Sequence, residues 1–142
     1  MVFFTDRMVF FDTNVLLYSI SRNPHEAAKR ERAIALLERD DGALSAQVLG
    51  EFYVQATRPT RRDALPHDLA AALISKWTRF PVQEINLSIV TAALEITAAH
   101  GFSYWDSAII AAARALGCSE LYTEDMSHGR QIARVTIVNP FR

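Results

Sequence analysis

The sequence predicts an α/β fold in which a mainly parallel sheet of four to five strands is flanked by helices. Short apolar runs with the character of buried strands alternate with longer runs of helical spacing. No tight hairpin turn is indicated between neighbouring apolar runs, so we expect right-handed crossovers between the strands. A chain of 142 residues is long enough for one domain with its own core, and we expect a single domain over 1–142.

In the first half of the chain, turn and cap residues separate the apolar runs. The run that ends at Asp12 is the first strand, and helical spacing begins soon after it. The Met-Val-Phe-Phe sequence occurs twice, and residues 1–7, which hold the first copy, are expected to be a dispensable N-terminal extension. Pro24 suits the first turn of the second helix, and the Asp-Asp-Gly sequence at 40–42 is a turn signal. The expected order is a strand over 8–11, helices over 15–20 and 25–38, a strand over 43–46 and a helix over 47–56.

In the second half, prolines and glycines mark the ends of the elements. Pro66 opens a helix, Pro81 stands at the first position of a short edge strand, and Gly101 ends a helix. The last two strands are short apolar runs, each followed by polar residues. The expected order is a helix over 66–79, a strand over 81–85, helices over 87–99 and 103–116, and strands over 120–123 and 135–138.

Composition and charge restrict the function only broadly. Hydrophobic residues make up 50% and charged residues 22% of the chain, as in a globular protein and not in a disordered one. The formal net charge of −1 does not by itself indicate a polyanion-binding protein, so local clusters of charge decide that question. No apolar run approaches the roughly 18 residues of a membrane span, and the single cysteine, Cys118, cannot form an internal disulfide. We therefore expect a cytoplasmic protein that is not membrane-bound.

Four carboxylates stand next to the expected strand ends and helix starts. Asp12 ends the first strand, Glu51 lies one turn into the helix after the second strand, and Asp106 lies in the first turn of a helix. Glu124 and Asp125 follow a later strand, and either of them can be the fourth acid. In a parallel sheet the carboxyl ends of the strands and the starts of the following helices share one edge. The sequence therefore predicts that four acids converge on one side of the domain.

Each acid also has a purely structural interpretation. Asp12 can be only the N-cap of the helix that follows it. Glu51 can lie on a solvated polar stripe with Gln47 and Gln55, and Asp106 can complete a capping box with the serine three residues before it. The acids after the later strand can belong to a turn. These four interpretations are independent of one another, and they do not explain why the acids share one edge.

Four segments of the chain resemble, in order, the motifs of PIN-domain ribonucleases, and specifically of the VapC-type toxins of bacterial toxin–antitoxin pairs. The resemblance covers most of the chain, from about 8 to 138, and four motifs in the right order are a much stronger signal than any one of them. The matching segments are FFDTN at 10–14, LSAQVLGEF at 44–52, SYWDSAIIAAA at 103–113 and LYTEDM at 121–126.

This resemblance implies a function and a set of site residues. It implies a parallel sheet flanked by helices, RNA cleavage that depends on Mg²⁺ or Mn²⁺, inhibition by a small cognate antitoxin, and a homodimer. The metal-binding acidic site that it implies consists of Asp12, Glu51, Asp106 and Asp125. By the position in the motif, Asp125 is preferred to Glu124 as the fourth acid.

The chemistry of the residues agrees with this function. A cluster of carboxylates without cysteine or a clear histidine set selects hard cations such as Mg²⁺ or Mn²⁺, which can activate a water for attack on a phosphodiester. Thr13, Asn14 and Thr123 are placed to orient the acids, although turn and cap hydrogen bonds explain them equally well. RNA requires positive charge around the acids, and a basic loop follows the helix that carries Glu51. The arginines of this loop are Arg58, Arg61 and Arg62.

Two other functions compete with a metal-dependent endoribonuclease toxin. A catalytically silent PIN-like module would bind RNA or a partner protein without cutting, but such a module does not need all four acids. A phosphohydrolase of the haloacid-dehalogenase type also begins with a strand that ends in Asp. That family requires a second Asp two residues later, where this chain has Asn14, and its motif lysine is not evident.

Overall fold

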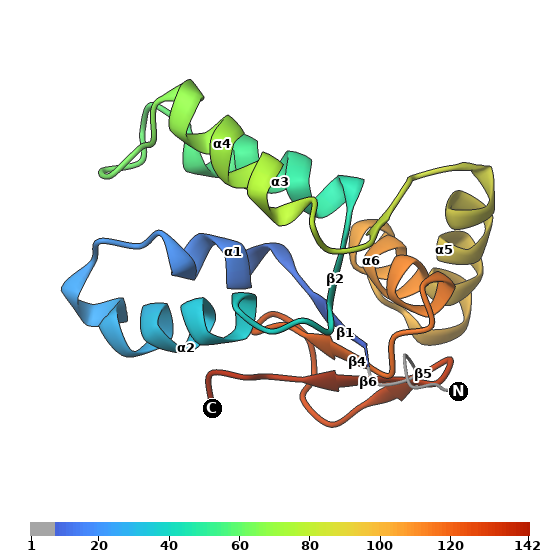
Figure 1. The fold of residues 1–142 in the computed structure, drawn as a ribbon. Coiled ribbons are helices and arrows are strands. Elements are labelled where there is room, and N and C mark those ends of the chain that lie inside the picture. The colour runs from blue at the N-terminus through green and yellow to red at the C-terminus, as the bar shows by residue number, and fades with distance from the viewer. Residues whose placement is uncertain (1–7) are drawn as a thin grey trace.

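The computed structural model describes residues 8–142, and the expected N-terminal extension over 1–7 lies outside this part. The fold is α/β, with one six-stranded sheet in the order β3-β2-β1-β4-β6-β5 (Figure 1). Neighbouring strands pair in parallel, except for the antiparallel pair β5 and β6. The strands are β1 (Val9–Phe11), β2 (Gly42–Ser45), β3 (Val82–Gln83), β4 (Glu120–Tyr122), β5 (Gln131–Ile132) and β6 (Val135–Val138).

Helices cover the sheet in three groups. In Figure 1, α1 and α2 lie on one side of the strands, α5 and α6 lie together on the other side, and α3 and α4 pack against each other above them. None of the helices in the described part is long and apolar enough to cross a membrane. The helices are α1 (Thr13–Ser19), the short 3-10 helix η2 (Pro24–Glu26), α2 (Ala27–Leu37), α3 (Ala46–Ala56), α4 (His67–Trp77), α5 (Leu87–His100) and α6 (Tyr104–Ala115).

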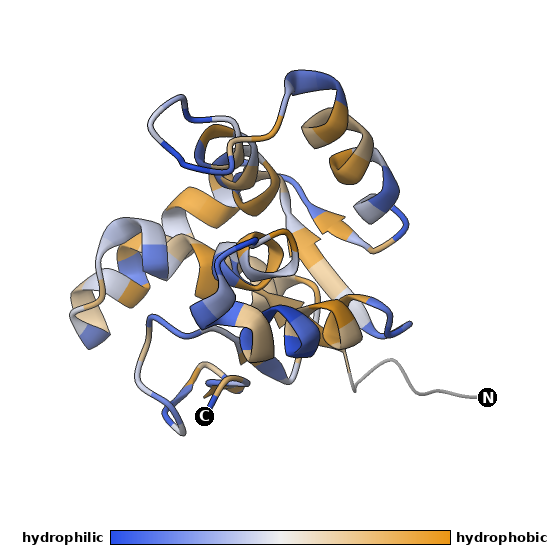
Figure 2. Ribbon diagram, turned by 90° about the vertical axis from the view of Figure 1, so that its left-hand side faces the viewer, coloured by the Kyte–Doolittle hydropathy of each residue, from blue (hydrophilic) through white to orange (hydrophobic). Residues whose placement is uncertain are grey.

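The core is centred on β1, which lies between β2 and β4. Every residue of β1 is buried, as expected for a strand covered on both faces, and Figure 2 shows hydrophobic strands at the centre of the molecule. Phe11 packs edge-on against Phe80 and Tyr122, with ring centroids 6.0 and 6.2 Å apart. A Cβ on Gly42 would lie 2.5 Å from Cε2 of Phe11 and 2.8 Å from Cε1 of Phe80, so only glycine fits at the start of β2.

Most elements agree with the sequence prediction, and the differences have local causes. The mainly parallel α/β sheet, the edge position of β3 after Pro81 and the end of α5 at Gly101, with φ +77°, are confirmed. The expected number of four to five strands was too low, because β5 was not predicted. It pairs with β6 through a two-residue turn at Ala133 and Arg134, whose φ angles are 51° and 74°. Such turns usually contain Gly or Asn, so the sequence carried no hairpin signal here.

Candidate active site

A pocket of about 330 Å³ lies where β1 and β4 end, and four carboxylates line it. They come from the end of β1, from α3, from the first turn of α6 and from the segment after β4. A parallel sheet brings these positions together because its strands end at the same edge. The four residues are Asp12, Glu51, Asp106 and Asp125.

Asp12 is the most buried of the four carboxylates, with 5% of its surface exposed. Its Oδ1 accepts a hydrogen bond from the backbone N–H of Thr13, and its Oδ2 accepts one from the hydroxyl of Thr123, both at 2.7 Å. Burial raises the pKa of Asp12 to about 6; the two hydrogen bonds oppose this rise, and the charges of Asp125 and Glu51 add to it. Asp12 therefore caps α1 and also belongs to the acidic pocket.

Thr123 connects the two strand ends that carry Asp12 and Asp125. Its buried hydroxyl donates to Asp12 and accepts from Nδ2 of Asn14 at 3.2 Å and from the backbone N–H of Asp125 at 3.1 Å. Asn14 Nδ2 also lies 3.1 Å from Oδ2 of Asp125. One threonine and one asparagine thus hold both carboxylates in place.

Glu51 is oriented by two side chains on either side of it. Its Oε1 accepts from the hydroxyl of Thr13 at 2.7 Å, and its Oε2 accepts from Nε2 of Gln47 at 3.1 Å. The same Gln47 amide lies 3.3 Å from the carbonyl oxygen of Trp105, which joins α3 to the start of α6. Glu51 is half-buried and fixed by these contacts, so it does not belong to a solvated stripe.

Asp106 stands in the first turn of α6, where Ser103 caps the helix. The backbone N–H of Asp106 donates to Oγ of Ser103 at 3.2 Å. Burial and the charge of Asp125 raise the pKa of Asp106, a hydrogen bond from the Ser103 side chain to the carboxylate opposes this rise, and the charge of Glu51 adds to it. The capping interaction expected from the sequence is present, and the carboxylate still lines the pocket.

The two neighbouring acids after β4 have different environments. Asp125 lines the pocket, whereas the carboxylate of Glu124 accepts hydrogen bonds from the hydroxyl of Tyr18 and from the ammonium group of Lys29. Although burial alone would raise it, the pKa of Glu124 is lowered by these two hydrogen bonds and by the charge of Lys29. The structure therefore places Asp125, and not Glu124, with the other three acids.

The arginines of the basic loop lie away from the acids. None of the three lines the acidic pocket. Arg61 and Arg62 line a second pocket, and Nε of Arg61 forms an ion pair with Oδ1 of Asp63 at 2.9 Å. Arg58 is exposed and lines neither pocket.

Some residues of the site were not predicted from the sequence. Gln55 and the apolar residues Leu17 and Ile109 also line the acidic pocket, and Gln47 orients Glu51. The two glutamines lie four residues before and four residues after Glu51, so the spacing already placed them on the same face of α3. The apolar residues gave no signal, because helical spacing assigns them equally well to the core.

The side chains of the pocket fit a hard divalent cation. Its lining contains four carboxylates and neither cysteine nor histidine, and oxygen ligands of this kind suit Mg²⁺ or Mn²⁺. Within residues 8–142, no group of three Asp, Glu, His or Cys side chains lies close enough to hold an ion together. Mg²⁺ usually keeps several waters and binds through one or two carboxylates, so a site for it does not require three protein ligands.

Solved structures with the same fold include a toxin–antitoxin complex and a toxin. A toxin–antitoxin complex from Klebsiella pneumoniae has a TM-score of 0.69 and 21% sequence identity, covering 93% of this chain and 97% of that one. VapC20 of Mycobacterium tuberculosis, described as a toxin that cleaves the sarcin-ricin loop, has a TM-score of 0.66 and 24% identity, covering 82% and 89%. FitAcB from Neisseria gonorrhoeae has a TM-score of 0.68 and 19% identity, covering 94% and 99%.

Comparison with family profiles is more specific than the likeness in fold. No curated protein matches the chain in sequence. The profile of the PIN domain, however, matches residues 9–133, which include all four acids of the pocket and every strand except β6. The chain therefore belongs to the PIN domain family.

Proposed function

We propose that this protein is a metal-dependent endoribonuclease toxin that cleaves RNA phosphodiester bonds and is neutralised by a small cognate antitoxin. The observation that carries the proposal is the pocket that Asp12, Glu51, Asp106 and Asp125 line together. Burial and neighbouring negative charges raise the pKa of Asp12 and of Asp106, so the gathered carboxylates cost free energy in the absence of a cation. Carboxylates whose pKa values are raised in this way are found more often in functional sites than elsewhere in a protein.

Asp12 and Asp106 are the preferred direct ligands of Mg²⁺ or Mn²⁺, while Glu51 and Asp125 bind directly or through water. When bound, the cation would stabilise the negative charge that develops on the phosphate during cleavage. The residues around the acids keep their oxygens in place. Thr13 holds Glu51 through its hydroxyl, and Thr123 holds Asp12, so both acids keep one orientation.

Asn14 gives the site its connection to Asp125. Its Nδ2 donates toward Oδ2 of Asp125 and toward Thr123, and its Oδ1 accepts from the backbone N–H of Glu124 at 3.3 Å. These contacts leave the other oxygen of the Asp125 carboxylate free for a ligand or a water. We assign Thr13, Asn14 and Thr123 as positioning residues on this basis.

The similar structures and the family support a proposal for the partners. One of the similar structures is a toxin–antitoxin complex, and another is a toxin described as cleaving the sarcin-ricin loop. We propose an RNA substrate, a small antitoxin, a cytoplasmic location and a two-fold homodimer, built from one PIN domain per chain. Light scattering at micromolar concentration tests the dimer, and a mass of one chain throughout would contradict it.

Cleavage of total RNA tests the function. We expect new RNA ends with Mg²⁺ or Mn²⁺, none with a chelator, and none with Asp12→Asn in either metal. Asp40→Asn removes a fully exposed carboxylate that lines neither the acidic pocket nor the pocket of Arg61 and Arg62, and it is expected to leave cleavage intact. A wild type that binds several RNA pools without cutting any of them would instead favour a catalytically silent PIN-like module.

A further inference from the structure

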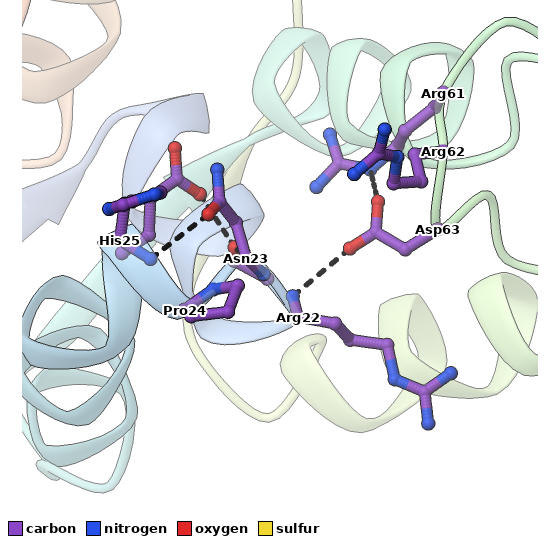
Figure 3. A pocket seen from close by; sticks show the side chains of 9 residues that line it. Arg22, Asn23, Pro24, His25, Arg61, Arg62 and Asp63 are labelled. Carbon is purple, nitrogen blue, oxygen red and sulfur yellow. Dashed lines mark hydrogen bonds and ion pairs between the residues drawn. The ribbon is translucent and has the colours of Figure 1, made fainter.

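A second pocket, of about 570 Å³, lies beyond the C-terminal ends of α1 and α3. The segment 21–26, between α1 and α2, forms one wall, and the segment 61–63, between α3 and α4, forms the other (Figure 3). We call it the basic pocket, because three arginines and His25 are among its residues. Its lining shares no residue with that of the acidic pocket.

The two acids of the basic pocket, Asp63 and Glu26, accept hydrogen bonds from other residues of the chain. Asp63 accepts from Nε of Arg61 at 2.9 Å and from the backbone N–H of Arg22 at 3.0 Å, which ties the two walls together. Glu26 accepts from the hydroxyl of Ser21 at 2.6 Å. Both carboxylates therefore neutralise part of the positive charge of the pocket. In the described part of the chain, they accept only from Arg61, Arg22 and Ser21, so the remaining donors of the pocket stay available to a ligand.

Side-chain donors lie on both walls of the pocket. Arg62 is exposed and forms no ion pair or side-chain hydrogen bond within residues 8–142. In Figure 3 the guanidinium groups of Arg61 and Arg62 extend toward the wall that carries Asn23 and His25, whereas the side chain of Arg22 extends away from them. Oδ1 of Asn23 accepts from the backbone N–H of His25 at 3.0 Å, so its amide group remains as a donor. The pocket thus presents guanidinium and amide donors to an anion.

The basic pocket and the acidic pocket lie along the same two helices. α1 begins beside the acidic pocket at Thr13 and ends shortly before Ser21, and α3 carries Glu51 and ends shortly before Arg61. A rise of about 1.5 Å per residue gives roughly 9 Å from Thr13 to the end of α1 and roughly 8 Å from Glu51 to the end of α3. α1 and α3 also pack against each other, so both pockets open along one pair of elements.

We propose that the basic pocket binds a backbone phosphate of the RNA strand, away from the phosphate that is cleaved, through Arg61, Arg62 and Asn23. The inference rests on the proposed function, because it assigns a second contact to the same RNA. A guanidinium group matches phosphate oxygens in a two-pronged geometry, and the contact reads no base. The basic pocket therefore positions the RNA strand over the acidic pocket without selecting for the base sequence of the RNA.

Binding of a fluorescent single-stranded RNA of about 10 nucleotides, measured by anisotropy in a chelator, tests the site without cleavage. Arg62→Gln removes one charge, Arg62→Lys keeps it, and Arg114→Gln is the matched control, an exposed arginine that lines a different pocket. We expect Arg62→Gln to weaken binding about tenfold, equivalent to about 1.4 kcal/mol, and to reduce the salt slope by about 0.7. Arg62→Lys should recover part of the affinity, and Arg114→Gln should bind like the wild type.

Cleavage kinetics add a second readout. With Mg²⁺, Arg62→Gln should raise KM for the long RNA with kcat unchanged, and should not affect a dinucleotide, which is too short to reach both pockets. Wild-type affinity in Arg62→Gln, equal losses in Arg62→Gln and Arg114→Gln, or no RNA binding by the wild type would overturn the inference. The inference would also be overturned if Arg62→Gln weakened the binding of an acidic protein partner but not the binding of RNA. If the wild type never cleaves but its RNA binding depends on Arg62, the proposed function fails and the phosphate site stands.

Discussion

Replacing Asp12 by Asn is expected to change the stability of the metal-free protein in a direction that depends on pH. Burial raises the pKa of Asp12 from 3.8 to about 6, a difference that corresponds to about 3 kcal/mol at 1.36 kcal/mol per pH unit. Between about pH 4 and pH 6 the folded protein keeps a proton that the unfolded chain has lost. The free energy of unfolding of the wild type therefore falls as pH rises through this window, and the charged carboxylate has its full cost above about pH 6.

The amide removes the charge but disturbs one hydrogen bond. Oγ1 of Thr123 donates to Oδ2 of Asp12 and already accepts from Asn14 and from the backbone of Asp125. An Asn Nδ2 at the position of Oδ2 would therefore place donor against donor, which costs about 1 to 2 kcal/mol. The net effect is a variant about 1 to 2 kcal/mol more stable than the wild type at about pH 8 and less stable by a similar amount at about pH 4.

Urea denaturation followed by circular dichroism, with a chelator present and across this pH range, measures the difference. Asp40→Asn is the control, because it removes a carboxylate from a fully exposed side chain that does not line the acidic pocket. A difference between Asp12→Asn and wild type that stays constant with pH would refute the argument that a buried charge destabilises the site. So would a variant that is as destabilised at about pH 8 as at about pH 4.

Two other substitution pairs test the site and the core. Asp125→Asn is expected to lower the initial rate of RNA cleavage at least about tenfold, whereas Glu124→Gln, which changes the neighbouring acid outside the pocket, should keep the rate and lose only some thermal stability. Equal rates in the two variants would reverse our assignment of the fourth acid. Gly42→Ala should lower the free energy of unfolding by about 1 to 3 kcal/mol, because its Cβ would meet Phe11 and Phe80, while Gly50→Ala has open space and should stabilise α3 slightly. An unchanged urea midpoint for Gly42→Ala would contradict the packing described for β1 and β2.

Signals that are local in the sequence predicted the fold well. Pro81 and Gly101 mark their element ends because proline and a left-handed glycine act on the backbone at their own position. The meeting of Asp12 and Asp106 follows from topology, since parallel strands end at one edge. The hairpin at Ala133 and Arg134 was missed because neither residue favours the positive φ that the turn imposes.

Contacts between distant segments could not be predicted from the sequence. Thr123 holds Asp12 across 111 positions of the chain, and no spacing rule connects the two. The choice between Glu124 and Asp125 depends on the direction in which each side chain points from the segment after β4. Tyr18 on α1 and Lys29 on α2 bind the carboxylate of Glu124 and so keep it out of the acidic pocket. The basic loop was correctly placed after α3, but its proximity to the segment 21–26 arises only when α1 and α3 pack together.

Binding of Mn²⁺ tests most directly the central claim that these carboxylates form a metal site. Electron paramagnetic resonance of free Mn²⁺ gives the affinity of the wild type, of Asp106→Asn and of Glu124→Gln without any RNA. We predict that the wild type binds Mn²⁺, that Asp106→Asn binds it at least about tenfold more weakly, and that Glu124→Gln binds it like the wild type. A wild type that leaves Mn²⁺ free at millimolar concentration, or two variants of equal affinity, would contradict the claim.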